Sequence, residues 1–190
     1  MEEFKKMIAG EPYDPSDEHL SDLRHRARQL LYQFNHTSYE ERESAKALME
    51  NLLGSVGDNV SIHQNFYCDY GCNIHVGANF FANYHCVILD CAEVRFGDDC
   101  MLGPQVGIYT ATHPLDPIER ASGVESAKPI RIGNKCWIGG NATINPGVSL
   151  GDNVVVASGS VVTKSFGDNV VIGGNPAKVL REIPSSKVEI

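Results

Sequence analysis

The sequence predicts a mainly β fold, a parallel coil of short strands, with a short helical segment at its N-terminus. Apolar side chains recur at helical spacing in residues 16–53, and from about Val60 onward a period of six replaces the helical one. In addition, the residue after each repeating aliphatic side chain is small or turn-forming. A period of six with these residues fits neither a long helix nor a long strand, but it fits short strands joined by corners.

An N-terminal helical cap is expected over residues 1–57. Its apolar positions fit two amphipathic helices and are Leu20, Leu23, Ala27, Leu30, Leu31 and Phe34, then Ala45, Leu48, Met49 and Leu52. Between the two helices, Ser38 and Glu41 have the spacing of a capping box, and Gly54 is placed to end the second helix. We expect this segment to pack on the coil that follows it.

The repeat is expected over residues 58–183. Steps of six reach an aliphatic residue each time: Ile132, Ile138, Ile144, Leu150, Val156 and Val162. The same register upstream gives Phe96, Leu102 and Ile108, and a second register, displaced by two residues, gives Val76, Ala82, Ile88 and Val94. Three hexads would make a turn of 18 residues, and the stacked turns a triangular prism with an aliphatic column inside. Glycines are expected to turn the corners, where positive φ costs them least.

The repeat is interrupted once, by an excursion loop at residues 109–129. A loop this long in a fold of tight corners is expected to be functional. Gly173, Gly174 and Pro176 are expected to end the coil, and residues 184–190 to form a loose tail.

Composition excludes several classes of function. A formal net charge of −8 argues against nucleic acid as a partner, because phosphates require a basic face. No segment has the apolar length of a membrane span, and the polar N-terminus resembles no secretory signal, so we expect a cytoplasmic protein without a membrane partner. None of the six cysteines forms a C-x-x-C pair, and we interpret them as reduced core thiols.

Five stretches resemble a known family, and they are "NFYCDYGCNIHVGANFFANYHCVILD", "THPLD", "KPIRIGNKCWIGGNATINPGVSLGDN", "ASGSVVTK" and "GGNPAKVLREI". They are similar to the maltose, galactoside and nodulation O-acetyltransferases, a group of hexapeptide-repeat acyltransferases, and the N-terminal helices resemble that group's cap. The resemblance implies a left-handed parallel β-helix, whose hand is opposite to the usual crossover. It also implies acetyl-CoA as co-substrate with no metal, a sugar acceptor, and a homotrimer with active sites between subunits.

The excursion loop contains His113 in the "THP" context that resembles the family's general base. A neutral imidazole can remove the proton of a sugar hydroxyl near neutral pH. The resemblance implies direct transfer in a ternary complex, without an acyl-enzyme. The other six histidines are expected to be structural or surface residues.

Carboxylates are natural partners of sugar hydroxyls. The resemblance assigns Asp69, Asp90 and Glu125 to the acceptor site, together with an N-terminal aspartate for which Asp14 is chosen over Asp17. Glu125 could instead orient His113, or be a solvated loop charge.

The residues that the resemblance assigns to the cofactor are Asn83, Trp137, Gly140, Ser158, Thr163, Lys164, Lys178 and Arg181. Among these, the Gly140 N–H would stabilise the oxyanion, and the three cations would bind phosphates of CoA. Ser158 and Thr163 are expected on one side of the coil, lining the pantetheine groove, although each also suits an ordinary corner.

Three alternatives remain open. The acceptor could be an antibiotic or serine, although the short cap and "THPLD" favour the sugar group. A zinc hydratase of the γ-carbonic anhydrase type would need three converging histidines, and His63, His75 and His85 have no obvious match to such a set. The third alternative is a binding scaffold without catalysis.

Overall fold

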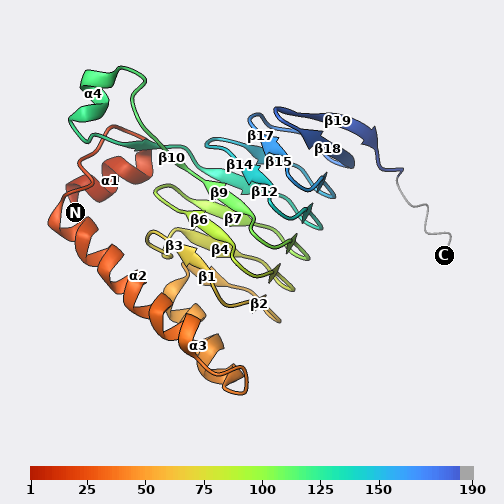
Figure 1. The fold of residues 1–190 in the computed structure, drawn as a ribbon, viewed down its shortest axis with the longest axis horizontal. Helices are drawn as coiled ribbons and strands as arrows, with labels where there is room; N and C mark the ends of the chain where they lie inside the picture. Colours follow the sequence, from red (N-terminus) through yellow and green to blue (C-terminus); the bar gives the residue numbers. More distant parts are fainter. Residues whose placement is uncertain (185–190) are drawn as a thin grey trace.

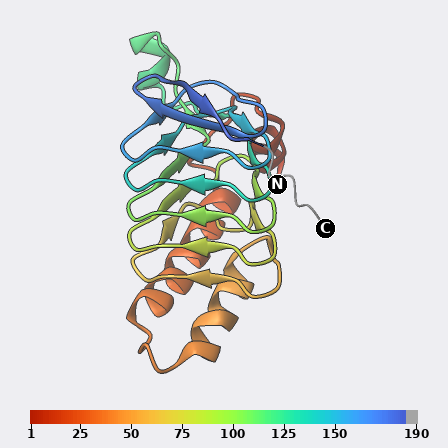
Figure 2. The same ribbon diagram turned by 90° about the vertical axis from the view of Figure 1, so that its right-hand side faces the viewer.

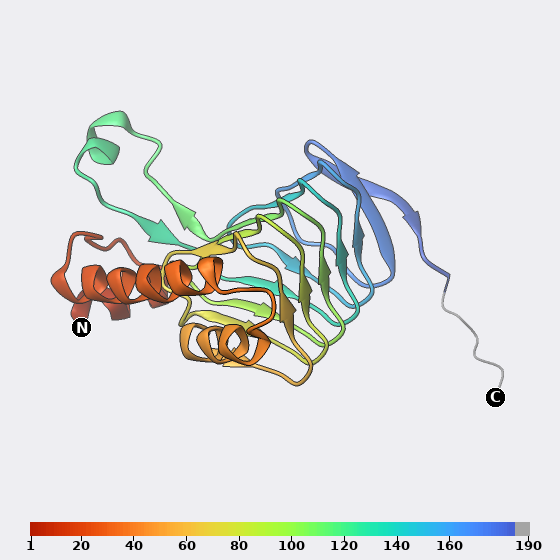
Figure 3. The same ribbon diagram turned by 60° about the horizontal axis from the view of Figure 1, so that its bottom comes forward.

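The computed structural model describes residues 1–184 and shows three parallel sheets wound from one continuous chain. Apart from the final antiparallel hairpin, each strand of these sheets pairs in parallel with the strand one turn later, so the sheets form the three sides of a prism (Figure 3). Figure 2 shows the turns stacked between the helices at one end and the last hairpin at the other. The period of six therefore corresponds to one side of a triangular coil.

The three sheets, called I, II and III here, have the following strands. Sheet I contains β1 (Ser55–Val56), β4 (Ile74–Val76), β7 (Val94–Phe96), β12 (Ile130–Ile132) and β15 (Ser149–Leu150). Sheet II contains β2 (Ser61–Ile62), β5 (Phe81–Ala82), β8 (Met101–Leu102), β13 (Trp137–Ile138), β16 (Val155–Val156), β18 (Val170–Gly174) and β19 (Ala177–Glu182). Sheet III contains β3 (Tyr67–Cys68), β6 (Val87–Leu89), β9 (Gly107–Tyr109), β14 (Thr143–Ile144) and β17 (Val161–Val162).

The predicted aliphatic column forms the core of the coil. Ile138, Ile144 and Val162 are completely buried, and the other predicted inward positions belong to the same core cluster. Burial of each such side chain stabilises the fold by about 1.5–3 kcal/mol. The prediction of an inward column is confirmed.

The two registers seen in the sequence come from turns of different length. In the C-terminal half, Ile132 pairs with Leu150, which is the predicted step of 18 residues, but the last turn is shorter, because Val156 pairs with Ile172, a step of 16. In the N-terminal half, Ala82 pairs with Leu102, a step of 20, so the prediction of 18 is wrong there. The extra residues lie where β4 and β7 each point two side chains inward, and the corners before these strands contain Asp69 and Asp90.

Glycine has a different role in the coil from the one predicted. The positive φ angles at the corners belong mostly to other residues, for example Asn79 at 57° and Asn141 at 58°. The glycine that follows each inward aliphatic residue is required by close packing between turns instead. A Cβ on Gly103 would lie 2.5 Å from the backbone nitrogen of Gly140, and one on Gly133 would lie 2.5 Å from the carbonyl oxygen of Gly151.

Helices α1 (Glu2–Ala9), α2 (Glu18–His36) and α3 (Arg42–Leu52) form the N-terminal cap. The sequence pattern predicted α2 and α3 but not α1. Helix α3 begins at Arg42, three residues later than the capping box predicts. The Ser38 N–H donates to the Glu41 carboxylate as in a capping box, but Ser38 and Glu41 close a turn that precedes the helix. The coil begins before the expected boundary, since β1 already pairs with β4.

Helices α2 and α3 close the end of the prism that starts with β1 and β2 (Figure 1). Their buried faces, with Leu31, Phe34 and Leu52, belong to the same core cluster as the aliphatic column. The Asn35 amide joins the two parts, because it donates to the carbonyl oxygen of Phe66 at 3.0 Å. The helical cap is thus continuous with the coil.

The excursion loop contains a two-stranded antiparallel ribbon, β10 (Ala111–Thr112) and β11 (Ser126–Ala127), and a short helix, α4 (Pro117–Ala121). It projects from the side of the coil (Figures 1 and 3). At the other end of the prism, the chain reverses after Gly174 into the antiparallel pair β18 and β19, where Ile172 and Ala177 complete the core. The predicted end of the coil is confirmed, and the predicted tail lies largely outside the described residues.

Candidate functional site

A groove on the outer surface of sheet II brings together four residues that the sequence assigned to cofactor binding: Asn83, Trp137, Gly140 and Ser158. Its volume is about 480 Å³. Asn83 follows β5, Trp137 begins β13, and Gly140 and Ser158 follow β13 and β16. They meet because equivalent positions of successive turns stack on one face of the coil.

Trp137 was predicted to lie in this groove, but Phe81 and Met101, which complete its apolar floor, were not. Phe81, Met101 and Trp137 are in register on neighbouring strands and point outward, since the residue after each one is buried. Trp137 is 52% exposed and Met101 48% exposed, and because they are neighbours they form an exposed apolar patch. These three residues each come immediately before an inward position of the repeat, and this shared position is the sequence signal that identifies the row.

The backbone around Gly140 is suited to act as a donor. Within residues 1–184, the Gly140 N–H has no hydrogen-bond acceptor, whereas the Gly140 carbonyl accepts from Gly159 at 2.9 Å. Gly140 lines the groove with Trp137 and Pro104. An unpaired N–H at the edge of a partly apolar groove can stabilise negative charge that develops on a ligand oxygen.

His113 is exposed and lies directly after β10, at the base of the projecting loop. It does not line the groove of sheet II. The segment around it is ordered by Arg120, whose guanidinium donates to the carbonyl oxygens of Pro114 and Leu115, and by Asp116, which caps α4. Within one chain, His113 and the groove of sheet II therefore do not form a single site.

Two of the predicted acceptor carboxylates lie near each other at the base of the loop. The Tyr13 hydroxyl donates to Glu125 Oε2 at 2.7 Å, and the Cys91 thiol donates to Asp69 Oδ2 at 3.5 Å. Burial raises the pKa of the Asp69 carboxyl, and the Glu125 charge acts in the same direction. These two carboxylates are thus close enough to influence each other.

Asp90 is completely buried and binds backbone rather than solvent. Its Oδ1 accepts from the N–H groups of Asp69 and Tyr70, and its Oδ2 accepts from the Asn73 N–H. Burial raises the pKa of Asp90 to about 7, although the bonds from Tyr70 and Asn73 act in the opposite direction. Asp90 therefore fixes the wide corner that carries Asp69 and does not present its carboxylate to the surface.

The two N-terminal aspartates have different surroundings. Asp17 caps α2 by accepting from the Leu20 N–H, so its carboxylate is engaged in the fold. Asp14 is exposed and accepts from the N–H and hydroxyl of Ser16. Of the two, Asp14 has the carboxylate that is accessible to a ligand.

The predicted phosphate-binding cations lie near the C-terminal end of the coil and are exposed. Lys164 follows β17, and its ammonium lies 5.5 Å from the centre of the Phe166 ring, whereas Lys178 and Arg181 belong to β19. Thr163 follows β17 on sheet III, while Ser158 follows β16 on sheet II. The expectation that Ser158 and Thr163 share one side of the coil is wrong, because successive hexads occupy successive faces.

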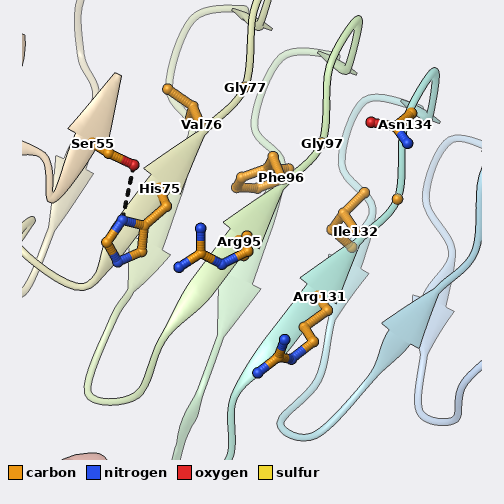
Figure 4. Close-up of a pocket in the computed structure, with 11 residues that line it drawn as sticks. Ser55, His75, Val76, Gly77, Arg95, Phe96, Gly97, Arg131, Ile132 and Asn134 are labelled. Atoms are coloured by element: carbon orange, nitrogen blue, oxygen red, sulfur yellow. Dashed lines mark hydrogen bonds between the residues drawn. The ribbon is translucent and has the colours of Figure 1, made fainter. Parts of the chain in front are cut away.

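A second, smaller hollow of about 280 Å³ lies on sheet I. Figure 4 shows His75, Arg95 and Arg131 projecting from neighbouring strands, with His75 Nδ1 bonded to the Ser55 hydroxyl at 2.9 Å. Glu93 contacts all three, at 2.7 Å from Arg95, 3.5 Å from Arg131 and 3.9 Å from His75. None of the predicted site residues lines this hollow.

In the part of the chain that the structure describes, no three histidine, cysteine or carboxylate side chains converge as a metal site would require. His63 lies between the edges of Phe81 and Tyr84, whereas His75 belongs to sheet I.

Across residues 1–184, no helix combines the length and apolar character needed to cross a bilayer.

Comparison with family models gives two matches. Residues 6–57 match the maltose acetyltransferase hexapeptide capping motif, and residues 129–164 match the hexapeptide repeat of succinyl-transferase. The first covers helices α2 and α3, and the second covers the strand that begins with Trp137 and the turn that contains Gly140.

Whole-chain comparisons agree with these matches. The chain is 39% identical to the galactoside O-acetyltransferase of Escherichia coli K12, over 94% of this chain and 88% of that protein. The solved maltose O-acetyltransferase from Clostridium difficile 630 has 47% identity and a TM-score of 0.95, covering 96% of this chain and 97% of its own. A hexapeptide-repeat acetyltransferase from Vibrio cholerae O1, solved with acetyl coenzyme A, has 34% identity and a TM-score of 0.90, covering 97% and 100%. The predicted fold class, a left-handed parallel β-helix with an N-terminal helical cap, is confirmed.

Proposed function

The chain belongs to the family of maltose and galactoside O-acetyltransferases and is an acetyltransferase, and on this premise we propose that it moves an acetyl group from acetyl-CoA to a sugar hydroxyl. The main support is the groove of sheet II, where the Gly140 N–H, which has no acceptor within residues 1–184, lies beside Trp137 and Asn83. The solved Vibrio relative was crystallised with acetyl coenzyme A, which supports the same co-substrate here.

In the proposed reaction, the neutral imidazole of His113 accepts the proton of the attacking hydroxyl as its oxygen adds to the thioester carbonyl. The Gly140 N–H donates to the oxyanion of the tetrahedral intermediate. The C–S bond then breaks, the acetyl group stays on the sugar oxygen, and the imidazolium returns its proton to the departing sulfur of CoA. Transfer is direct and leaves no acetyl group on the protein.

The groove of sheet II is the proposed site for the pantetheine arm and the thioester. Its apolar floor, with Phe81, Met101 and Trp137, suits a thin chain that carries few charges. Ser158 lies further along the same groove. Thr163, Lys164, Lys178 and Arg181 are the proposed contacts of the phosphates and adjoining groups, because an acidic protein needs a local group of cations to bind CoA.

The proposed acceptor site lies at the base of the excursion loop. Asp69 and Glu125 would accept hydrogen bonds from sugar hydroxyls, and the exposed Asp14 would line the rim. Asp90 contributes in this proposal through the corner that it holds, since all of its carboxylate bonds are to backbone.

We further propose a homotrimer in which one subunit supplies His113 and its neighbour supplies the groove. The separation of these two parts within one chain supports a shared site. Sheet III also has small or apolar outward residues, among them Val87, Gly107 and Val161, which suit a face buried against another subunit. The six cysteines are free thiols, which supports the proposed cytoplasmic location.

Release of free CoA thiol from acetyl-CoA tests the acceptor class. The panel contains mono- and disaccharides, with serine and chloramphenicol as the competing acceptors. Thiol release that depends on a sugar and exceeds release with serine or chloramphenicol supports the proposal. Release that depends only on serine or the antibiotic overturns the sugar assignment.

A further inference from the structure

Tyr13 joins the N-terminal segment to the excursion loop. The Tyr13 N–H donates to the Glu125 carbonyl at 2.9 Å, and the Glu125 N–H donates to the Tyr13 carbonyl at 3.2 Å. The Tyr13 hydroxyl donates to the Glu125 carboxylate at 2.7 Å. Tyr13 and Glu125 are thus bonded to each other through both their backbones and their side chains.

The Tyr13 ring is anchored in a second core cluster, separate from the aliphatic column. The ring is 1% exposed and packs with Tyr70, Cys91 and Ala127. Burial raises the pKa of the Tyr13 hydroxyl, so the group stays protonated and remains a donor at working pH. A rigid aromatic donor fixes its acceptor more precisely than a flexible side chain would.

Two donors hold the two acceptor carboxylates in place. The Tyr13 hydroxyl binds Glu125, the Cys91 thiol binds Asp69, and Cys91 lies beside Tyr13. The two carboxylates repel each other. Without the Tyr13 hydroxyl, Glu125 would lose the bond that orients its carboxylate, and only the two backbone bonds to Tyr13 would remain, so the loop would also be held less firmly.

We infer that Tyr13 is a positioning residue that sets the Glu125 carboxylate for acceptor binding, so that the N-terminal segment contributes to acceptor specificity. This inference rests on the proposed function, in which Glu125 binds the sugar. Tyr13 does not touch the acceptor, and it acts through Glu125. Because it lies apart from the groove of sheet II, its effect is confined to the acceptor.

The test compares Tyr13→Phe, which keeps the buried ring, with the wild type and with Tyr32→Phe, a control in which the tyrosine is exposed on α2. We expect Tyr13→Phe to raise the KM for the sugar about tenfold, the usual scale for losing a hydrogen bond to a charged group. The KM for acetyl-CoA should stay within about twofold in both variants. An unchanged sugar KM, or an equal rise in both KM values, overturns the inference.

A double-mutant cycle separates positioning from a general structural role. In a Glu125→Ala background, Tyr13→Phe should cause no further rise in the sugar KM, because the group it orients is gone. A further tenfold rise in that background contradicts the inference. Should Tyr13→Phe fail to fold, Glu125→Gln with Tyr13 in place tests the carboxylate that Tyr13 is inferred to orient, and an unchanged sugar KM overturns the role of Glu125 and of Tyr13 together.

Hydrogen exchange keeps the inference testable if the wild type acetylates no sugar, which would refute the proposed function itself. In the full chain, Tyr13→Phe should speed amide exchange in residues 113–127 relative to Tyr32→Phe. Exchange equal to the wild type in that segment means that the Tyr13 hydroxyl does not hold the loop, and the inference is then wrong whatever the acceptor.

Discussion

At the scale of single residues, some side chains of the candidate site are available to a ligand, whereas others are fully engaged in hydrogen bonds within the protein. Asp69 and Asp90 illustrate the difference, because both follow strands of sheet III in similar sequence contexts. Asp90 is completely buried with three backbone N–H groups bound to its carboxylate, whereas Asp69 is bonded through one oxygen to the Cys91 thiol. Chemical type alone could not distinguish these two aspartates.

Replacement of Lys164 and Arg181 together with alanine should raise the KM for acetyl-CoA by about tenfold or more, since each charged contact with a phosphate contributes on the order of 1 kcal/mol. The KM for the sugar should stay nearly constant, because these residues lie near the C-terminal end of the coil. Steady-state kinetics with each substrate varied in turn checks this. Lys46→Ala, an exposed lysine on α3, is the control. An acetyl-CoA KM equal to that of the control would show that Lys164 and Arg181 do not contribute to cofactor binding.

At the scale of elements, the spacing between turns sets the position of Gly140. The glycines after β8 and β13 lie on successive turns, and there is no room for a side chain between them. The proposed oxyanion donor is therefore fixed by contacts between coils. In contrast, the excursion loop is held by a short ribbon and by Tyr13, which suits the proposal that this segment reaches a neighbouring subunit.

Gly103→Ala should lower kcat by about tenfold or more and destabilise the fold by about 1–3 kcal/mol. Its Cβ would lie 2.5 Å from the Gly140 nitrogen, so the backbone around Gly140 must shift. Gly167→Ala is a matched control, because a Cβ there meets nothing within 4 Å. Thermal unfolding and kcat measured on both variants check this. Equal behaviour of the two would show that the spacing between turns does not matter for the donor.

At the scale of the whole molecule, the three faces of the prism differ in character. Sheet I has a row of charged and polar side chains, including Arg95 and Arg131, while the groove of sheet II has an apolar floor. His113 lies on the excursion loop and does not line that groove. This distribution fits an assembly that buries sheet III and brings a loop to a neighbouring groove.

Mixing two inactive variants tests the shared site. His113→Ala removes the proposed base, and Asn83→Ala alters the groove, so each variant alone should have little activity. In mixed trimers, a site with an intact histidine from one subunit and an intact groove from its neighbour should form, and random mixing should restore about a quarter of wild-type activity. Light scattering gives the subunit number of the mixture. No gain in activity on mixing would place histidine and groove in one subunit.

The fold could be predicted largely from the sequence because six residues per side is a strict geometric repeat. Ile132 to Val162 gave the inward column, and the glycine after each aliphatic residue marked the close approach between turns, although for a different reason from the one expected. The turns of 20 residues were not predicted. A strand with two inward residues, such as β4, still fits a step of six if only one of the two is counted, so the two extra residues of the turn are hidden in the repeat. Helix α1 was missed because its sequence lay outside the region of clear helical spacing.

The candidate site could be predicted only in part. Asn83, Trp137, Gly140 and Ser158 meet in one groove because the repeat itself aligns them. Contacts between distant segments, such as Tyr13 with Glu125, depend on how the loop folds back on the N-terminal segment, and no local pattern encodes that. The burial of Asp90 depends likewise on three backbone groups that come together only in the folded corner.

The central claim is that His113 removes the proton of a sugar hydroxyl during direct acetyl transfer, and the most direct test is the sugar-dependent rate of CoA release by His113→Ala beside the wild type. We predict that the variant stays folded with the wild-type subunit number, that its KM for acetyl-CoA is unchanged, and that its kcat falls by about 10²–10⁴. A folded His113→Ala protein that keeps most of the wild-type rate with sugar would contradict the account.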